Sequence, residues 1–296
     1  MSAALQSAFS IEPLNSGIVI SVLTLVIIFG GVHRIAAISS VIVPVMAVGY
    51  IALALFVVLA NIDRIPAVVE QIVGNAFGWH QAVGGGIGTA LMQGIKRGLF
   101  SNEAGMGSAP NAAATAHVTH PAKQGFIQAL GVFTDTLLIC SCTAFIILFG
   151  EDYIGSGLDG IQLTQAALTS EVGNIGGIYV AIATLFFAYS SILGNYYYGE
   201  ANIRFFTSRQ WPVVLYRMLV GGMVLFGSLA SLNLVWNLAD VTMALMSICN
   251  LIAISLLGKY AFRLLDDYLA QKRKGIKSPV FHKEQMKDIE QDLECW

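Results

Sequence analysis

The residues with the most chemical capacity in this sequence lie in a short segment, Gly94 to Pro110, in the middle of a long apolar region. The segment combines charged and amide side chains with glycine and proline, namely Lys96, Arg97, Gly98, Asn102, Glu103, Gly105, Gly107 and Pro110. A simple helix facing lipid would not tolerate this mixture, because polar groups are costly there and glycine and proline weaken helices. Polar side chains inside an apolar span usually mark a path or a binding site for ions or polar solutes.

We predict that a helix breaks within this segment. Gly98 would end the first half, which would begin near Val83, and Ser108 would cap the second half, with Pro110 in its first turn. Residues 99–107 would be unwound, and their peptide groups would line a cavity inside protein, because unpaired peptide groups are excluded from lipid. The start of the second half-helix would suit a carboxylate, and the exposed carbonyls would suit Na⁺ or an ammonium group. A kinked helix with glycines for close packing is the alternative.

A second group of polar side chains lies between Phe187 and Glu200. Ser190, Ser191, Asn195 and Tyr198 lie close together on a helical wheel, and Ser191 and Asn195, four residues apart, share one helix face. Their hydroxyl and amide oxygens could bind Na⁺ or a small solute. Hydrogen bonding between helices is the alternative use of these side chains.

These segments belong to a chain whose composition indicates an integral membrane protein. The sequence has 296 residues, of which 56% are apolar and 11% charged, whereas soluble domains have about 25% charged residues. A helix needs about 20 apolar residues to cross a bilayer, and seven apolar stretches are candidates: residues 17–32, 35–60, 83–118, 126–149, 175–198, 213–232 and 235–262. Residues 63–77 mix charged and apolar residues and predict a short interfacial helix.

The charges predict an orientation and argue against some functions. Most of the 16 Lys and Arg residues fall on one side of the seven-span arrangement, which places the C-terminus in the cytoplasm. The polar tail, residues 266–296, is then a cytoplasmic extension of a membrane domain formed by residues 1–265. The net charge of −2 gives no indication of nucleic-acid binding, and neither a metal-ligand spacing nor a catalytic constellation is apparent, so we expect no enzyme.

The string Gly98-Leu-Phe-Ser-Asn-Glu-Ala-Gly-Met-Gly-Ser-Ala-Pro110 resembles the alanine/glycine:cation symporter family, also called the sodium:alanine symporter family. The segments 29–36 and 191–200 are similar to the same family, and the resemblance covers about residues 15–265. It implies Na⁺- or H⁺-coupled uptake of alanine, glycine and related amino acids. It also implies an all-α, partial LeuT-like fold with five-plus-five inverted repeats, in which the broken span opens a second repeat of about residues 83–262.

The resemblance also suggests roles for individual residues. Phe100, Ser101 and Asn102 would contact the substrate from the unwound segment, with Met106 near the pocket for the substrate side chain. Ser191 and Asn195 would face the substrate from the later span, and Ser190 and Ser191 would bind the coupling ion. Many family members have Trp where this chain has Asn195, so its substrate preference could differ. No cofactor besides the coupling ion is implied.

Family members carry three or four further helices before the first span found here, so we expect this chain to be a C-terminal fragment of the family fold. Our hypothesis is Na⁺-coupled symport of alanine or glycine across the cell membrane by alternating access. A truncated, non-transporting membrane fragment or assembly partner is the first alternative, and an ion channel is the second.

Overall fold

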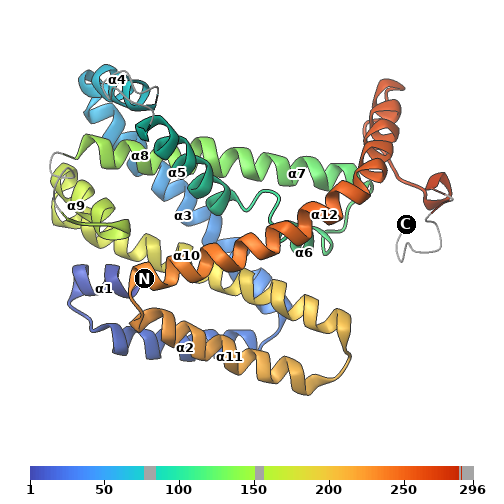
Figure 1. The fold of residues 1–296 in the computed structure, drawn as a ribbon, viewed down its shortest axis with the longest axis horizontal. Coiled ribbons are helices and arrows are strands. Elements are labelled where there is room, and N and C mark those ends of the chain that lie inside the picture. Colours follow the sequence, from blue (N-terminus) through green and yellow to red (C-terminus); the bar gives the residue numbers. More distant parts are fainter. Residues whose placement is uncertain (77–84, 151–156, 287, 289–296) are drawn as a thin grey trace. The chain divides into compact units, whose positions relative to one another are not determined.

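The computed structural model describes residues 1–76, 85–150, 157–286 and 288, and every regular element within them is a helix (Figure 1). The α-helices are α1 (Ser2–Phe9), α2 (Pro13–Ile28), α3 (Val32–Ala60), α4 (Ile65–Ala76), α5 (Gly85–Asn102), α6 (Ala109–Ala113), α7 (Pro121–Thr134), α8 (Cys140–Phe149), α9 (Gly160–Val172), α10 (Asn174–Phe206), α11 (Gln210–Leu229) and α12 (Leu232–Arg273). Two 3₁₀ turns, η1 (Ile62–Arg64) and η3 (Lys283–Met286), and a π-helical stretch, η2 (Asp135–Ile139), complete the elements.

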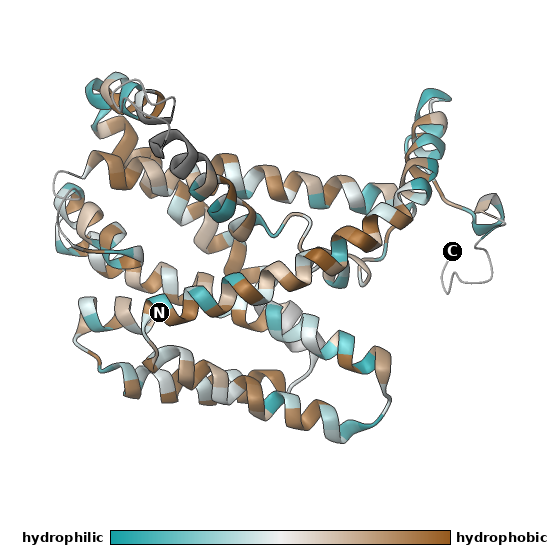
Figure 2. Ribbon diagram, viewed as in Figure 1, coloured by the Kyte–Doolittle hydropathy of each residue, from teal (hydrophilic) through white to brown (hydrophobic). Residues whose placement is uncertain are grey.

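The described helices include five that are long and apolar enough to cross a membrane. They occupy Ser39–Ala60, Pro121–Phe149, Asn174–Phe206, Gln210–Leu229 and Leu232–Arg273, and correspond to five of the seven predicted spans. The first predicted span is α2, which has 16 residues, and the third is interrupted; its predicted start, Val83, lies outside the described residues. Figure 2 shows apolar residues on most turns of these helices, and many large apolar side chains are exposed, as a lipid environment requires.

The chain forms two compact units, one of Met1–Leu99 with Asp135–Leu238 and the other of Phe100–Thr134 with Ala239–Trp296. In the first unit, α2 lies along α11 (Figure 1). Small residues allow this close approach: a Cβ on Gly17 would lie 2.7 Å from the Cβ of Ser228, and one on Gly221 would lie 2.9 Å from Leu25. Ser21 Oγ donates to the Gly221 carbonyl at 2.8 Å. Packing of small residues and interhelical hydrogen bonds is how apolar helices associate in lipid.

The main core of the first unit lies where α3, α4, α8, α9 and α10 meet. Its buried side chains are Tyr50, Ala54, Val57, Val68, Ile146, Phe149, Ala167, Leu168 and Val180. The predicted interfacial helix is present as α4, after η1, and contributes Val68 to this core; its predicted end, Phe77, lies outside the described residues. Its location at a membrane interface stays a prediction.

The second unit contains α6, α7, most of α12 and the C-terminal segment. After α12 ends at Arg273, the chain turns back, and the Phe281 N–H donates to the Thr119 carbonyl just before α7 at 3.0 Å. Phe281 and Met286 are buried there. The polar tail predicted from the sequence therefore has a defined docking position over residues 275–286.

Candidate functional site

The predicted break is present, but it lies later in the chain than the sequence suggested. α5 continues to Asn102, and the next helix, α6, begins at Ala109, so the non-helical residues are 103–108 rather than 99–107. The prediction that Gly98 ends the helix is wrong. The first residue past the helix is Glu103, with φ of +52° in the left-handed region, a position that glycine or asparagine usually occupies. The sequence-based rule therefore selected the wrong residue.

Phe100, Ser101 and Asn102 consequently lie in the last turn of α5 and not in unwound backbone. Asn102 Oδ1 accepts the Ala104 N–H at 2.9 Å, which stabilises the turn out of the helix. Met106 is inside the break and is buried, and its N–H donates to the Glu103 carbonyl at 3.1 Å. The predicted substrate residues of this segment are thus divided between a helix end and the loop that follows it.

Two glycines give the break its shape. Gly105 has φ of +76° and Gly107 has φ of +97°, conformations that residues with a Cβ rarely adopt. The Gly105 carbonyl accepts a hydrogen bond from Asn250 Nδ2 of α12 at 2.9 Å, and the Gly107 carbonyl accepts one from Asn111 Nδ2 at 3.1 Å. Amide side chains therefore hold the backbone oxygens of both glycines.

Ser108 stands at the N-cap position of α6 and Pro110 follows in its first turn, but the predicted capping bond is absent. The backbone of Ser108 is helical, with φ of −74° and ψ of −45°, whereas a side-chain cap needs an extended backbone. Ser108 is 3% exposed, and its Oγ has no hydrogen-bond partner among the described residues. α6 has only five residues, so few aligned peptide dipoles lie behind its N-terminus.

The second predicted group lies on α10, in the other compact unit, and α10 is unbroken through it. Ser190 Oγ and Ser191 Oγ both donate to the Phe187 carbonyl, at 2.9 and 3.0 Å. A hydroxyl that donates its proton keeps lone pairs that can accept a proton or bind a cation. Ser191 and Asn195 are exposed and share one helix face, as their spacing predicts.

Ser191 also lines a cavity of about 360 Å³ within the first unit. The walls are mostly apolar, from α3, α8, α9 and α10, with hydroxyls of Tyr50, Thr143, Thr164 and Thr184 besides that of Ser191. Tyr50 Oη and Thr143 Oγ1 are hydrogen-bonded at 2.7 Å. None of the described residues that line it is charged, so this cavity suits an uncharged group that can exchange hydrogen bonds with hydroxyls. Its volume is within the usual range of small-molecule sites.

Sequence reasoning missed a buried ionic cluster at the far end of α10. Glu200, 2% exposed, accepts hydrogen bonds from Tyr196 Oη and, at 2.7 Å, from Arg204 Nε. Arg217 of α11 donates from Nε to Tyr196 Oη at 2.9 Å, and its Nη2 lies 3.3 Å from each carboxylate oxygen. The Glu200–Arg204 spacing of four residues was a readable signal, but nothing local in the sequence indicates Arg217.

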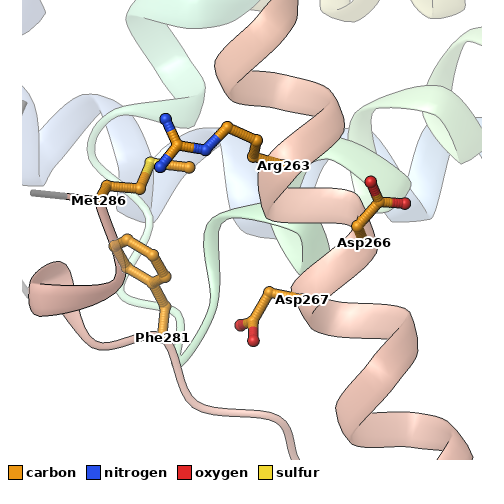
Figure 3. Close-up of a pocket in the computed structure, with 5 residues that line it drawn as sticks. All are labelled: Arg263, Asp266, Asp267, Phe281 and Met286. Carbon is orange, nitrogen blue, oxygen red and sulfur yellow. The ribbon is translucent and has the colours of Figure 1, made fainter. Parts of the chain in front are cut away.

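A second cavity of about 360 Å³ lies in the other unit, against the C-terminal part of α12 (Figure 3). Arg263, Asp266, Asp267, Phe281 and Met286 line it. In Figure 3, Arg263 extends toward Met286, whereas the Asp266 carboxylate points away from Phe281.

Beside this cavity, His120 is fully buried and its Nε2 lies 3.1 Å from Asp267 Oδ2. Its Nδ1 accepts the Ala122 N–H at 3.1 Å, so we assign the proton of the neutral ring to Nε2. Arg263 Nη1 donates to both carboxylate oxygens of Asp288, at 2.9 and 2.8 Å, and this hydrogen bond holds the pKa of Asp288 below its usual value. These contacts hold the C-terminal segment that turns back after α12. The residues that make them are not among the site residues predicted from the sequence.

The described part of the chain is all helical. It has five helices long and apolar enough to cross a membrane and, apart from these five, a helix that ends at Asn102 before a break with buried side chains, a combination typical of multi-pass membrane transporters. The comparison with known protein families identifies the transporter family. The model of the sodium:alanine symporter family matches residues 1–283, and the chain belongs to that family. The family consists of secondary transporters rather than enzymes, and the resemblance drawn from residues 98–110 is confirmed.

Individual relatives agree with this membership. A probable sodium/glutamine symporter of Bacillus subtilis is 52% identical over 296 residues, covering 100% of this chain and 62% of the relative. An amino-acid carrier protein of the same organism is 51% identical over 297 residues, covering 100% of this chain and 63% of the relative. A sodium/alanine symporter of Methanococcus maripaludis is 39% identical over 258 residues, covering 86% of this chain and 56% of the relative. The chain thus spans less than two thirds of the length of these relatives.

Proposed function

We propose that this chain forms part of a Na⁺-coupled symporter for a small neutral amino acid, alanine or glycine, that works by alternating access. The family supports coupling of amino-acid transport to Na⁺. The observation that carries the proposal is the break between Asn102 and Ala109. There, the buried Ser108 Oγ has no hydrogen-bond partner within the described ranges and adjoins non-helical backbone. Non-helical backbone at membrane depth is tolerated only where it is buried in protein or lines a cavity.

The proposed division of roles follows the two groups of residues. Phe100, Ser101 and Asn102 approach the substrate from the last turn of α5, and Met106 approaches it from the break, whose carbonyls and Ser108 hydroxyl offer oxygen ligands. Ser190 and Ser191 contribute hydroxyl oxygens from α10, suited to Na⁺, a hard cation that prefers oxygen. In this proposal the C-terminus lies in the cytoplasm. The inward Na⁺ gradient then drives the accumulation of substrate inside the cell.

Uptake into membrane vesicles tests the proposal. Vesicles should contain the protein encoded by the complete reading frame that includes this chain, because a partial chain tests only the fragment. We expect saturable accumulation of alanine or glycine that needs an inward Na⁺ gradient and stops when the gradient is collapsed. Accumulation that is driven by a proton gradient in the absence of Na⁺ would identify H⁺ coupling instead. If labelled alanine and glycine never exceed the external concentration under either gradient, the proposed symport is wrong; flux that does not saturate would indicate a channel.

Two substitutions test the residue roles. Phe100→Ala and Ser191→Ala should raise the KM for substrate without reducing the amount of protein in the membrane, because both remove a contact and not a folding element. Wild-type kinetics in both variants would remove these residues from the site.

Asn195 is the residue we expect to influence substrate size. Its side chain is exposed on the face shared with Ser191, so a larger residue there would narrow the space beside the hydroxyls. Asn195→Trp should therefore lower uptake of a bulkier substrate such as glutamine more than that of glycine. Competition between labelled glycine and unlabelled alanine or glutamine measures this preference, and unchanged competition would remove Asn195 from substrate selection.

A further inference from the structure

Asn250 is the residue of α12 that contacts both glycines of the break. Its Nδ2 donates to the Gly105 carbonyl at 2.9 Å. A Cβ placed on Gly107 would lie 3.0 Å from Asn250 Cβ and 3.2 Å from its Cγ. The two residues are far apart in sequence, and the contact lies wholly within the second compact unit. Asn250 therefore meets the break at both of its glycines, where the backbone has positive φ.

The break needs an external contact of this kind. Gly105 and Gly107 have wide conformational freedom, and the local bonds inside the break, such as Met106 N–H to the Glu103 carbonyl, do not involve the peptide oxygen of Gly105. The bond from Asn250 therefore selects one orientation of the Gly105 peptide, and contact with Gly107 restricts the next turn of the chain.

We infer that Asn250 is a positioning residue for substrate and ion binding: it sets the backbone conformation of residues 105–108 and occupies the Gly105 carbonyl. This inference rests on the proposed function, because it assumes that the break meets the ligands. With the Gly105 oxygen engaged by Asn250, the buried Ser108 hydroxyl is left to face a ligand in a fixed geometry. Release of the amide would let the glycine pair relax and would misplace that hydroxyl.

The choice of asparagine follows from this role. The Gly105 oxygen is an acceptor, so the partner must donate, and a carboxylate of the same size would repel it. Asn250→Asp therefore removes the bond while preserving volume, and Asn250→Ala removes the bond together with the packing of Cγ and Oδ1. Asn237, an exposed asparagine of the same helix that belongs to the first compact unit, provides the matched control, Asn237→Ala.

The Gly107 contact provides an independent test by a double-mutant cycle. Gly107→Ala brings a methyl group against Asn250 and strains a φ of +97°. Combining it with Asn250→Ala removes the contacts with Asn250 Cγ and Oδ1, at 3.2 and 3.3 Å, but keeps the contact with Cβ at 3.0 Å and the strain at Gly107. The two changes should therefore be less than additive in their effect on KM, as expected for residues in contact. Strict additivity would show that Asn250 does not act through Gly107.

Kinetic measurements separate positioning from folding. Asn250→Ala and Asn250→Asp should raise the KM for amino acid and the half-saturating Na⁺ concentration about fivefold, corresponding to loss of one hydrogen bond. Maximal uptake per folded molecule should change less. A role in folding alone would reduce the amount of folded protein and leave both constants unchanged. If both variants match Asn237→Ala in KM and in Na⁺ dependence while the wild type transports, the inference is overturned.

Hydrogen exchange provides a readout that does not depend on transport. In detergent-solubilised protein, Asn250→Ala should speed amide exchange at residues 104–108 at least fivefold, whereas Asn237→Ala should not. If the wild type shows no coupled uptake, the proposed function fails, and this measurement still decides whether Asn250 holds the break. Equal exchange in wild type and Asn250→Ala would reject the positioning role.

Discussion

The buried carboxylate of Glu200 offers the sharpest test of how this fold is stabilised. Glu200→Gln keeps the size of the side chain and removes its charge. The Glu200 side chain is 3% exposed, and its two cationic partners differ, since the side chain of Arg217 is 13% exposed and that of Arg204 is 43% exposed. The substitution therefore leaves Arg217 nearly buried without its counter-charge, while Arg204 can be solvated.

The magnitude follows from that difference. Breaking a buried ion pair by removing one partner costs about 3–5 kcal/mol. Because Arg204 is screened by solvent, we place Glu200→Gln at the lower end, about 3 kcal/mol, and Arg204→Ala at about 1 kcal/mol or less. At about 2 °C per kcal/mol for a chain of this length, the apparent Tm should fall by about 6 °C for Glu200→Gln and by about 2 °C for Arg204→Ala.

Thermal unfolding of detergent-solubilised protein, followed by size-exclusion chromatography at a fixed heating rate, measures the two shifts. Glu70→Gln is the matched control, because Glu70 is exposed in the same unit, and it should leave the apparent Tm unchanged. The reasoning is refuted if Glu200→Gln unfolds with the wild type, or if Arg204→Ala costs as much as Glu200→Gln.

The remaining predictions concern three other positions. Gly199→Ala should destabilise the first unit by about 1–3 kcal/mol, because its methyl group would collide with the Tyr216 hydroxyl; a wild-type melting temperature would contradict this. Ser108→Ala should raise the melting temperature without ligand, because it removes a buried hydroxyl that has no partner in the described part of the chain and a penalty of about 1–3 kcal/mol. The same change should weaken Na⁺-dependent uptake; a loss of stability would show that the hydroxyl already has a partner. Arg263 depresses the pKa of Asp288, so the ion pair stabilises the docked tail at pH values above the ordinary aspartate pKa and is lost as pH falls through the lowered value. The protection of residues 277–286 against hydrogen exchange, taken relative to the intrinsic amide rate at each pH, should fall on acidification. Asp288→Asn should show the lower protection already at neutral pH; protection in the variant equal to that of the wild type at neutral pH would reject the link.

The positions of most membrane helices could be predicted because they depend on local composition. Lipid requires a helix to satisfy its own peptide groups along about 20 apolar residues, and the stretches at 35–60, 175–198 and 213–232 have that length without further information. The existence of the break was predictable for the same reason, since Gly105, Gly107 and Pro110 disfavour a continuous helix. The residues surrounding the candidate site could therefore be identified from the sequence.

The exact start of the break and the partners of the polar residues could not be predicted in this way. A helix passes through Gly98 and ends at Glu103, where a non-glycine residue adopts positive φ, a choice that depends on the energy of the whole turn rather than on one residue type.

The sequence by itself determined that this protein is helical, lies in a membrane and breaks one helix near Gly105, because each of these properties is settled within about 20 consecutive residues. Only the tertiary structure decided that Asn250 holds the Gly105 carbonyl, that Arg217 joins Glu200 and that the tail docks beside His120. These contacts join residues distant in the chain, and which donor meets which acceptor depends on how the helices pack, which no local pattern of residue types specifies.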